Sequence, residues 1–253
     1  MSAVYLDHAA AAPLSPAARA AWLEAAAMTG NPSSSHGPGR AARRIVERAR
    51  EEVAALAGAD PLDVIFTSGG TEADNLAVIG LARARRAVDS RCRRIIVSAV
   101  EHPAVLGPAR QLASEGFELV ELPVDASGRV DLSQAAAVID ADRESVALVS
   151  CQWTNNETGA IQPLAELAAW ARAGGAPIHC DAVQAFAYEA VRLTPAPGSD
   201  GPELDALTLS AHKIGGPVGV GALLARRRWP FQPVLFGGGQ ENGRRPGTVP
   251  AAL

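Results

Sequence analysis

The 253-residue sequence contains little cysteine and has no long apolar run. Its three cysteines, Cys92, Cys151 and Cys180, are widely spaced, so we expect neither a disulfide framework nor a zinc site, and we expect a cytoplasmic setting. No segment approaches the ~18 consecutive apolar residues of a membrane span, and the N-terminus lacks a signal-peptide pattern. The net charge of −4 gives no reason to expect binding to nucleic acid or to a membrane.

Lysine is almost absent: of the 23 lysine and arginine residues, only Lys213 is a lysine. It stands in the segment TLSAHKIGGP. A genomic bias toward arginine explains the abundance of arginine, and one lysine can survive such a bias by chance. However, a lysine amine can lose its proton and attack a carbonyl carbon, which a guanidinium group cannot do. Lys213 is therefore a candidate nucleophile.

Short apolar runs alternate with amphipathic stretches, which predicts an α/β fold. Several runs are apolar throughout, as strands covered on both faces require. We expect a mostly parallel seven-stranded sheet flanked by helices, with the last strand in a hairpin and a surface loop over 194–203. The expected strands are 63–68, 94–100, 117–123, 145–153, 177–182, 204–212 and 219–226, and the expected helices are 37–57, 71–86, 103–115, 131–140 and 163–174.

Polar segments follow the expected strands, and ligands bind at the carboxyl ends of strands in open α/β sheets. The segments are TSGGTEADN (67–75), EHP (101–103), TNNETG (154–159), CDAVQ (180–184) and SAHK (210–213). The glycines of the first segment and the helix after it suit a phosphate group, although an ordinary N-cap turn explains them equally well. We expect the segments to line one site.

Individual residues in these segments have two interpretations each. Asp181 could pair with a cationic ring nitrogen, or it could form a capping box with Gln184 at the start of a helix, which the local pattern slightly favours. His102 could stack on an aromatic ligand or shuttle a proton, or it could satisfy the end of the helix that Pro103 starts. Asn156 could hydrogen-bond a ring substituent.

The four kinds of group that pyridoxal phosphate (PLP) chemistry requires all occur in these segments. Lys213 provides an amine for the aldehyde, Asp181 a carboxylate for the pyridine nitrogen, the 69–71 turn donors for the phosphate, and His102 a flat group for the ring face. Any single match is common, but the four together at strand ends favour a PLP site.

The sequence resembles the class V aminotransferase family, and specifically the NifS/IscS-like cysteine desulfurases, in segments that run in family order from residue 5 to residue 248. These segments are YLDHAAAAP, GNPSSSHGPGRAAR, IFTSGGTEADNLA, EHPAV, NNETGAIQP, HCDAVQA, LSAHKIGGPVGVGAL and GGGQENGRRPGT. The resemblance implies an N-terminal arm over 1–15, a fold-type-I PLP-binding large domain over 16–253, and a homodimer.

The resemblance also implies a role for each candidate residue. Lys213 would bind the PLP aldehyde covalently, Asp181 would pair with the pyridine nitrogen, and His102 would stack on the ring. The other implied contacts are Asn156 and Gln184 with ring substituents, Gly70, Thr71, Ser210 and His212 with the phosphate, and Thr248 with the phosphate of the partner subunit.

The implied reaction converts L-cysteine to L-alanine and transfers the sulfur to an enzyme cysteine, from which an acceptor protein would take it for iron–sulfur cluster assembly. In the family, that cysteine and the arginine that binds the substrate carboxylate lie in a small C-terminal domain, which has no counterpart here. None of the three cysteines stands in a glycine- and serine-rich loop. We therefore expect this chain alone to bind PLP without forming a persulfide.

Two alternatives remain at this point. The chain could have another class V activity, such as that of a selenocysteine lyase or an aminotransferase. It could also be a non-catalytic remnant that only dimerises or binds a partner.

Overall fold

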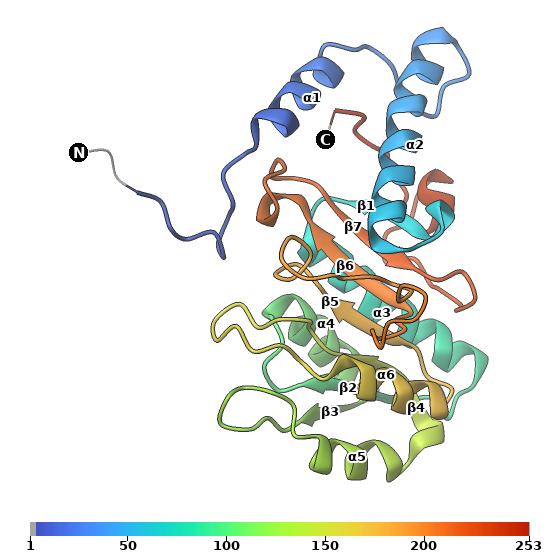
Figure 1. Cartoon of the computed structure of the whole chain (residues 1–253). Helices are drawn as coiled ribbons and strands as arrows, with labels where there is room; N and C mark the ends of the chain where they lie inside the picture. Colours follow the sequence, from blue (N-terminus) through green and yellow to red (C-terminus); the bar gives the residue numbers. More distant parts are fainter. Residues whose placement is uncertain (1–3, 253) are drawn as a thin grey trace.

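The computed structural model describes residues 4–252, which form a seven-stranded sheet with helices on both faces (Figure 1). The strands are β1 (Val64–Thr67), β2 (Arg94–Ser98), β3 (Glu118–Leu122), β4 (Val146–Ser150), β5 (Ile178–Asp181), β6 (Ala206–Ser210) and β7 (Gly221–Ala225). The helices are α1 (Pro16–Ala26), α2 (Gly37–Ala57), α3 (Gly70–Val88), α4 (Pro103–Ser114), α5 (Leu132–Asp140) and α6 (Leu164–Ala173). The predicted α/β class is confirmed.

The strand order is β1-β7-β6-β5-β4-β2-β3. Strands β3, β2, β4, β5 and β6 pair in parallel, whereas β7 is antiparallel to both of its neighbours, β6 and β1. The mostly parallel sheet with a hairpin at its last strand is therefore confirmed. This arrangement places the carboxyl ends of β1, β2, β4, β5 and β6 at one edge of the sheet, where a ligand site is expected.

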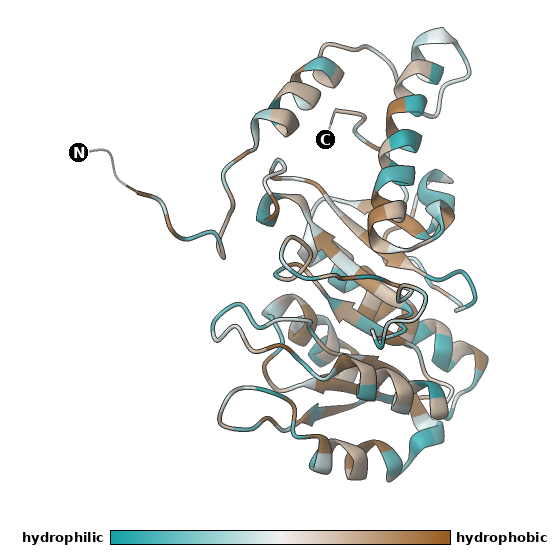
Figure 2. Cartoon of the chain, viewed as in Figure 1, coloured by the Kyte–Doolittle hydropathy of each residue, from teal (hydrophilic) through white to brown (hydrophobic). Residues whose placement is uncertain are grey.

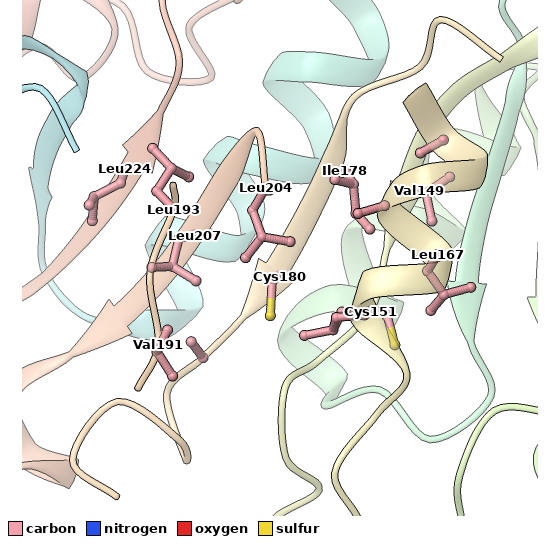
Figure 3. Packing of buried hydrophobic residues seen from close by; sticks show 14 of the residues in the cluster. Val149, Cys151, Leu167, Ile178, Cys180, Val191, Leu193, Leu204, Leu207 and Leu224 are labelled. Carbon is pink, nitrogen blue, oxygen red and sulfur yellow. The ribbon is translucent and has the colours of Figure 1, made fainter. Parts of the chain in front are cut away.

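Successive side chains of each strand point to opposite faces of the sheet, and helices cover both faces, so the sheet is buried on both sides. In β2, Ile95 and Val97 pack with α3 and α4, whereas Ile96 packs in the other cluster with α2, α5 and α6. Figure 2 shows the strands as mostly hydrophobic and the outer helices as mixed. Figure 3 shows the second cluster from close by, with Cys151 and Cys180 among its aliphatic side chains.

Local chemistry explains where the helices begin and end. The Oγ of Ser15 accepts a hydrogen bond from the N–H of Ala18 at 3.1 Å, which caps α1. Helix α2 ends at Gly58, whose φ of 62° is the left-handed conformation that favours glycine at this position. Asp131 caps α5 by accepting from the N–H groups of Ser133 and Gln134.

Two local predictions were wrong. No helix follows Asp181, because residues 183–188 form turns, so Asp181 and Gln184 do not make a capping box. The basic segment DSRCRR predicts a surface position for Cys92, but this residue is only 1% exposed, because the arginines on either side of it point outward while the thiol packs in the core. The loop predicted over 194–203 is present.

Within residues 4–252, no helix combines the length and the apolar composition needed to cross a bilayer. The same residues contain no cluster of three or more histidine, cysteine, aspartate or glutamate side chains arranged to hold a metal ion.

Candidate functional site

A cavity of about 220 Å³ lies at the carboxyl ends of the parallel strands. It receives side chains from the starts of α3 and α4 and from the segments after β4, β5 and β6. Every predicted cofactor contact except Thr248 lines this cavity, namely Gly70, Thr71, His102, Asn156, Asp181, Gln184, Ser210, His212 and Lys213. The structure thus brings together residues spread over most of the chain.

The turn from β1 into α3 forms one wall and is tightly packed. Gly69 has a φ of 151° and precedes Gly70, the first residue of α3. Because Gly70 lines the cavity, the unpaired N–H groups in the first turn of α3 lie beside it. A Cβ on Gly70 would lie 2.9 Å from Cγ2 of Val183, and one on Gly221 would lie 2.7 Å from Cα of Gly69. Only glycine allows this close approach, and the result is an opening suited to an anion.

Ser210 and His212 extend the same wall from the end of β6. The Oγ of Ser210 lies 3.1 Å from Nδ1 of His212. Burial lowers the pKa of His212, and the positive charge of Lys213 lowers it further. A hydroxyl and an imidazole beside a helix start are suitable hydrogen-bond donors for a phosphate.

Lys213 ends the short 3₁₀-helix Ala211–Lys213 that follows β6. Its Nζ donates to the carbonyl oxygens of Ala9 and Ala10, and Nε2 of Gln184 donates to the same Ala9 oxygen at 2.9 Å. Burial lowers the pKa of Lys213, although Asp181 and Asp7 oppose this effect. A lowered pKa increases the fraction of neutral amine, which is the nucleophilic form.

Asp181 ends β5, and only 8% of its surface is exposed. Its Oδ1 accepts a hydrogen bond from the N–H of Val183 at 2.9 Å. Burial raises the pKa of Asp181, whereas this hydrogen bond, the nearby His102 and the positive charge of Lys213 lower it. Asp181 is therefore a buried carboxyl group with nearby groups that favour its ionised form.

His102 both caps α4 and lines the cavity. Its Nδ1 accepts a hydrogen bond from the N–H of Ala104 at 3.1 Å, so a proton of the neutral ring resides on Nε2. The structural and the ligand-facing interpretations of this residue are compatible, because the cap fixes the ring at the cavity edge.

The cavity also contains residues that the sequence reasoning missed, notably Asp74 and Gln152. Asp74 lies one helical turn after Gly70, so the helical period alone places it on the same face. Gln152 stands two residues after the end of β4, and its N–H donates to Oε1 of the buried Glu101 at 2.8 Å. Glu101 also accepts from Oγ of Ser98, which ties the segment before His102 to the end of β4.

Thr248 lies elsewhere. It lines a separate hollow of about 470 Å³ between α1, α2 and the segment around Arg245. Neither Lys213 nor Thr71 lines this hollow.

The three cysteines are free and buried, away from the cavity lining. Burial raises the pKa of the Cys92 thiol, and it raises those of Cys151 and Cys180 well above the usual value. The thiolate is the nucleophilic form of cysteine, and these environments disfavour it.

Comparison with known proteins identifies relatives over nearly the whole chain. The family model of class V aminotransferases matches residues 4–245. An IscS-like cysteine desulfurase of Mycobacterium tuberculosis is 45% identical over 249 residues, which cover 98% of this chain and 62% of that protein. A cysteine desulfurase of Cereibacter sphaeroides is 45% identical over 251 residues, again 98% of this chain and 62% of the relative. The chain thus spans less than two thirds of their length.

Solved structures agree with the sequence relatives. SspA in complex with cysteine superposes with a TM-score of 0.89 at 34% identity, over 99% of this chain and 70% of that one. DndA from Streptomyces lividans superposes with a TM-score of 0.82 at 42% identity, over 99% of this chain and 69% of that one.

Proposed function

This chain belongs to the class V aminotransferase family, a family of PLP-dependent enzymes, and we propose that the protein is a cysteine desulfurase that converts L-cysteine to L-alanine and transfers the sulfur to a thiol. The single observation that carries the proposal is the meeting of Lys213, Asp181 and the glycine-rich start of α3 in one cavity. The cysteine desulfurases among the relatives, and the cysteine bound to SspA, support L-cysteine as the substrate.

The residues of the cavity fit a phosphorylated pyridine aldehyde. Lys213 would hold the aldehyde carbon, Asp181 would face the pyridine nitrogen, and His102 would cover the ring. Gln184 and Asn156 would bind ring substituents, while Gly70, Thr71, Ser210 and His212 would bind the phosphate. A Cβ at Gly70 would lie 2.9 Å from Val183, so this position has no room for a side chain. The backbone N–H at the start of α3 would therefore donate the hydrogen bond to the phosphate.

Bound PLP supplies an electron sink for the negative charge that develops on the α-carbon of the substrate. The ionised Asp181 carboxylate would keep a proton on the ring nitrogen opposite it. The Nζ of Lys213 would remove the α-proton and return it at the product stage, since a pKa lowered by burial suits a general base. His102 Nε2 would be the second group available to move a proton at the cavity edge.

We propose that none of these three cysteines is the sulfur acceptor, because each thiol is buried and has a raised pKa. This chain alone would then bind PLP without forming a persulfide. We also propose that the chain consists of an arm (1–15) and a PLP-binding large domain (16–253). The protein would form a homodimer in the cytoplasm. It would pass the sulfur to an acceptor protein for iron–sulfur cluster assembly. The separation of Thr248 from Lys213 within one chain supports a contact of Thr248 with the partner subunit's cofactor.

The experiment is a titration with PLP followed by visible absorption and borohydride reduction. Wild type should develop a visible band, and reduction should add the mass of the cofactor to the peptide with Lys213. Because this is the chain's only lysine, the assignment is unambiguous. Addition of L-cysteine, but not of L-serine, should change the visible band.

Lys213→Ala should show neither the band nor the added mass, whereas the exposed Arg48→Ala should behave as wild type. Absence of a visible band in the wild-type chain would refute the proposal.

A further inference from the structure

Asp74 is a buried carboxyl group that lines the same cavity as Asp181 and has no role in the reaction described above. It lies on α3, one turn after Gly70, and only 1% of its surface is exposed. An ionised carboxyl group without a partner is very unfavourable at such a site. Its charge state therefore needs a physical explanation.

No cation in the described part of the chain compensates a charge on Asp74. Among residues 4–252, the only basic group in ion-pair range is His179, whose Nε2 lies 3.6 Å from Oδ1 of Asp74. The His179 ring is held between Oγ of Ser150 at 2.9 Å and Oγ1 of Thr208 at 3.0 Å. Burial lowers the pKa of His179 to about 3, so the ring is neutral at physiological pH. Oδ1 of Asp74 is fully buried and accepts no hydrogen bond.

Asp181 has the stabilising contacts that Asp74 lacks. The N–H of Val183 donates to Oδ1 of Asp181 at 2.9 Å, and the positive charge of Lys213 favours its ionised form. When two carboxyl groups share one buried site, the group with the poorer environment keeps the proton.

The electrostatics of Asp74 agree with this geometry. Burial raises the pKa of Asp74 well above its ordinary range, and the negative charge of Asp181 raises it further. A hydrogen bond with Thr208 opposes these effects but does not outweigh them.

We propose that Asp74 is a positioning residue of the cofactor site: as a neutral carboxylic acid, it leaves Asp181 as the carboxylate opposite the ring nitrogen. The role at the cofactor rests on the proposed function. If Asp74 took the negative charge, Asp181 would be the group to bind the proton, and it would lose the charge that pairs with the ring. Asp74 thus determines which of two neighbouring carboxyl groups is ionised.

The charge state can be measured by ¹³C NMR on the full chain labelled at the aspartate side-chain carboxyl carbons, without PLP. We expect one resonance to keep the chemical shift of the neutral acid at about pH 7, where exposed aspartates are ionised, and to be missing in Asp74→Asn. If every aspartate of the wild-type chain is ionised at that pH, the proposal is overturned. That outcome needs no variant, so it holds even if Asp74→Asn does not fold.

The positioning role is tested by PLP affinity, read from the visible band. Asn keeps the shape and the neutral charge of the protonated acid, so Asp74→Asn should bind PLP within about threefold of wild type, whereas Asp181→Asn should bind at least about tenfold more weakly. The pH dependence of the visible band should be unchanged in Asp74→Asn.

An affinity loss in Asp74→Asn as large as in Asp181→Asn would show that the charge of Asp74 is needed, and it would overturn the proposal. If the wild-type chain keeps the neutral aspartate resonance but binds no PLP, the proton is located on Asp74 while its role at a PLP site is refuted together with the proposed function.

Discussion

Arg50 and Glu241 lie 191 positions apart in the sequence and form a buried two-pronged ion pair. Nη1 of Arg50 lies 3.0 Å from Oε2 of Glu241, and Nη2 lies 2.6 Å from Oε1. Oε2 of Glu241 also accepts from the N–H of Phe66 at 2.8 Å. Glu241 has a φ of 48°, a left-handed conformation that is unfavourable for a non-glycine residue. The pair therefore holds a strained segment against α2 and β1.

Removal of one partner should destabilise the protein strongly. In Glu241→Ala the buried Arg50 charge loses its bidentate partner and keeps only the half-exposed Glu47 at 3.2 Å, so we expect the free energy of unfolding to fall by about 3 kcal/mol. Urea denaturation measures this loss. The exposed pair of Arg48 with Glu52 is the matched control, and Arg48→Ala should cost no more than ~0.5 kcal/mol. Similar losses in the two variants would contradict the structural role of Glu241.

Gly221 should tolerate no side chain. A Cβ there would lie 2.7 Å from backbone atoms of Gly69 and Leu209, which cannot rotate away. Gly221→Ala should therefore lower the free energy of unfolding by about 1–3 kcal/mol, and it should weaken PLP binding because Gly69 precedes the first residue of α3. Gly107, in α4, has open space around its Cα, so Gly107→Ala should be neutral or stabilising by up to about 1 kcal/mol. A stable Gly221→Ala that binds PLP normally would refute the tight contact.

The stability of the protein should fall as the pH rises toward about 8 because of Glu101. Burial raises the pKa of Glu101 from 4.5 to about 8, and the nearby Asp181 adds to this effect, whereas hydrogen bonds from Ser98 and Gln152 oppose it. A raised folded-state pKa means that the folded chain holds a proton that the unfolded chain releases, so this contribution is full below pH 4.5 and lost as the pH passes 8. Glu101→Gln should remove that part of the slope in unfolding experiments across this range. An unchanged slope would show that Glu101 is ionised in the folded protein.

His179 should act in the opposite direction at acidic pH. Burial lowers its pKa from 6.5 to about 3, so its contribution to stability is full above pH 6.5 and is lost as the pH falls toward 3. The difference in unfolding free energy between wild type and His179→Gln should therefore shrink on acidification. Exposed His8 is the control, and His8→Gln should change the free energy of unfolding at neutral pH by no more than about 0.5 kcal/mol. A constant difference for His179→Gln would contradict a buried neutral imidazole.

The sequence predicted the strands and helices well because their signals are local. A short, continuous apolar run such as RIIVSAV, which contains β2, is typical of a buried strand in an α/β chain. A proline or a capping residue starts most of the helices. The cavity was predictable for a related reason. Parallel strands put their carboxyl ends at one edge, so Asp181 and Lys213 must approach each other once the sheet forms.

Other features depend on contacts that no local pattern encodes. Gln184 stands three residues after Asp181, as in a capping box, but its side chain instead donates to the carbonyl of Ala9 in the distant arm. Likewise, nothing near Asp74 in the sequence distinguishes it from an ordinary polar residue on the first turns of a helix. Its burial follows from the packing of α3 on β5 and β6.

The carbonyl oxygens of Ala9 and Ala10 that receive the Lys213 amine belong to the main chain, which every amino acid has. The side chains at these two positions can therefore vary without altering that contact. Shortening or lengthening the peptide between this point and Ser15, whose N–H is anchored on the oxygen of Gly215, would instead displace both oxygens at once. The arm should consequently accept exchanges of residue type far more readily than insertions or deletions.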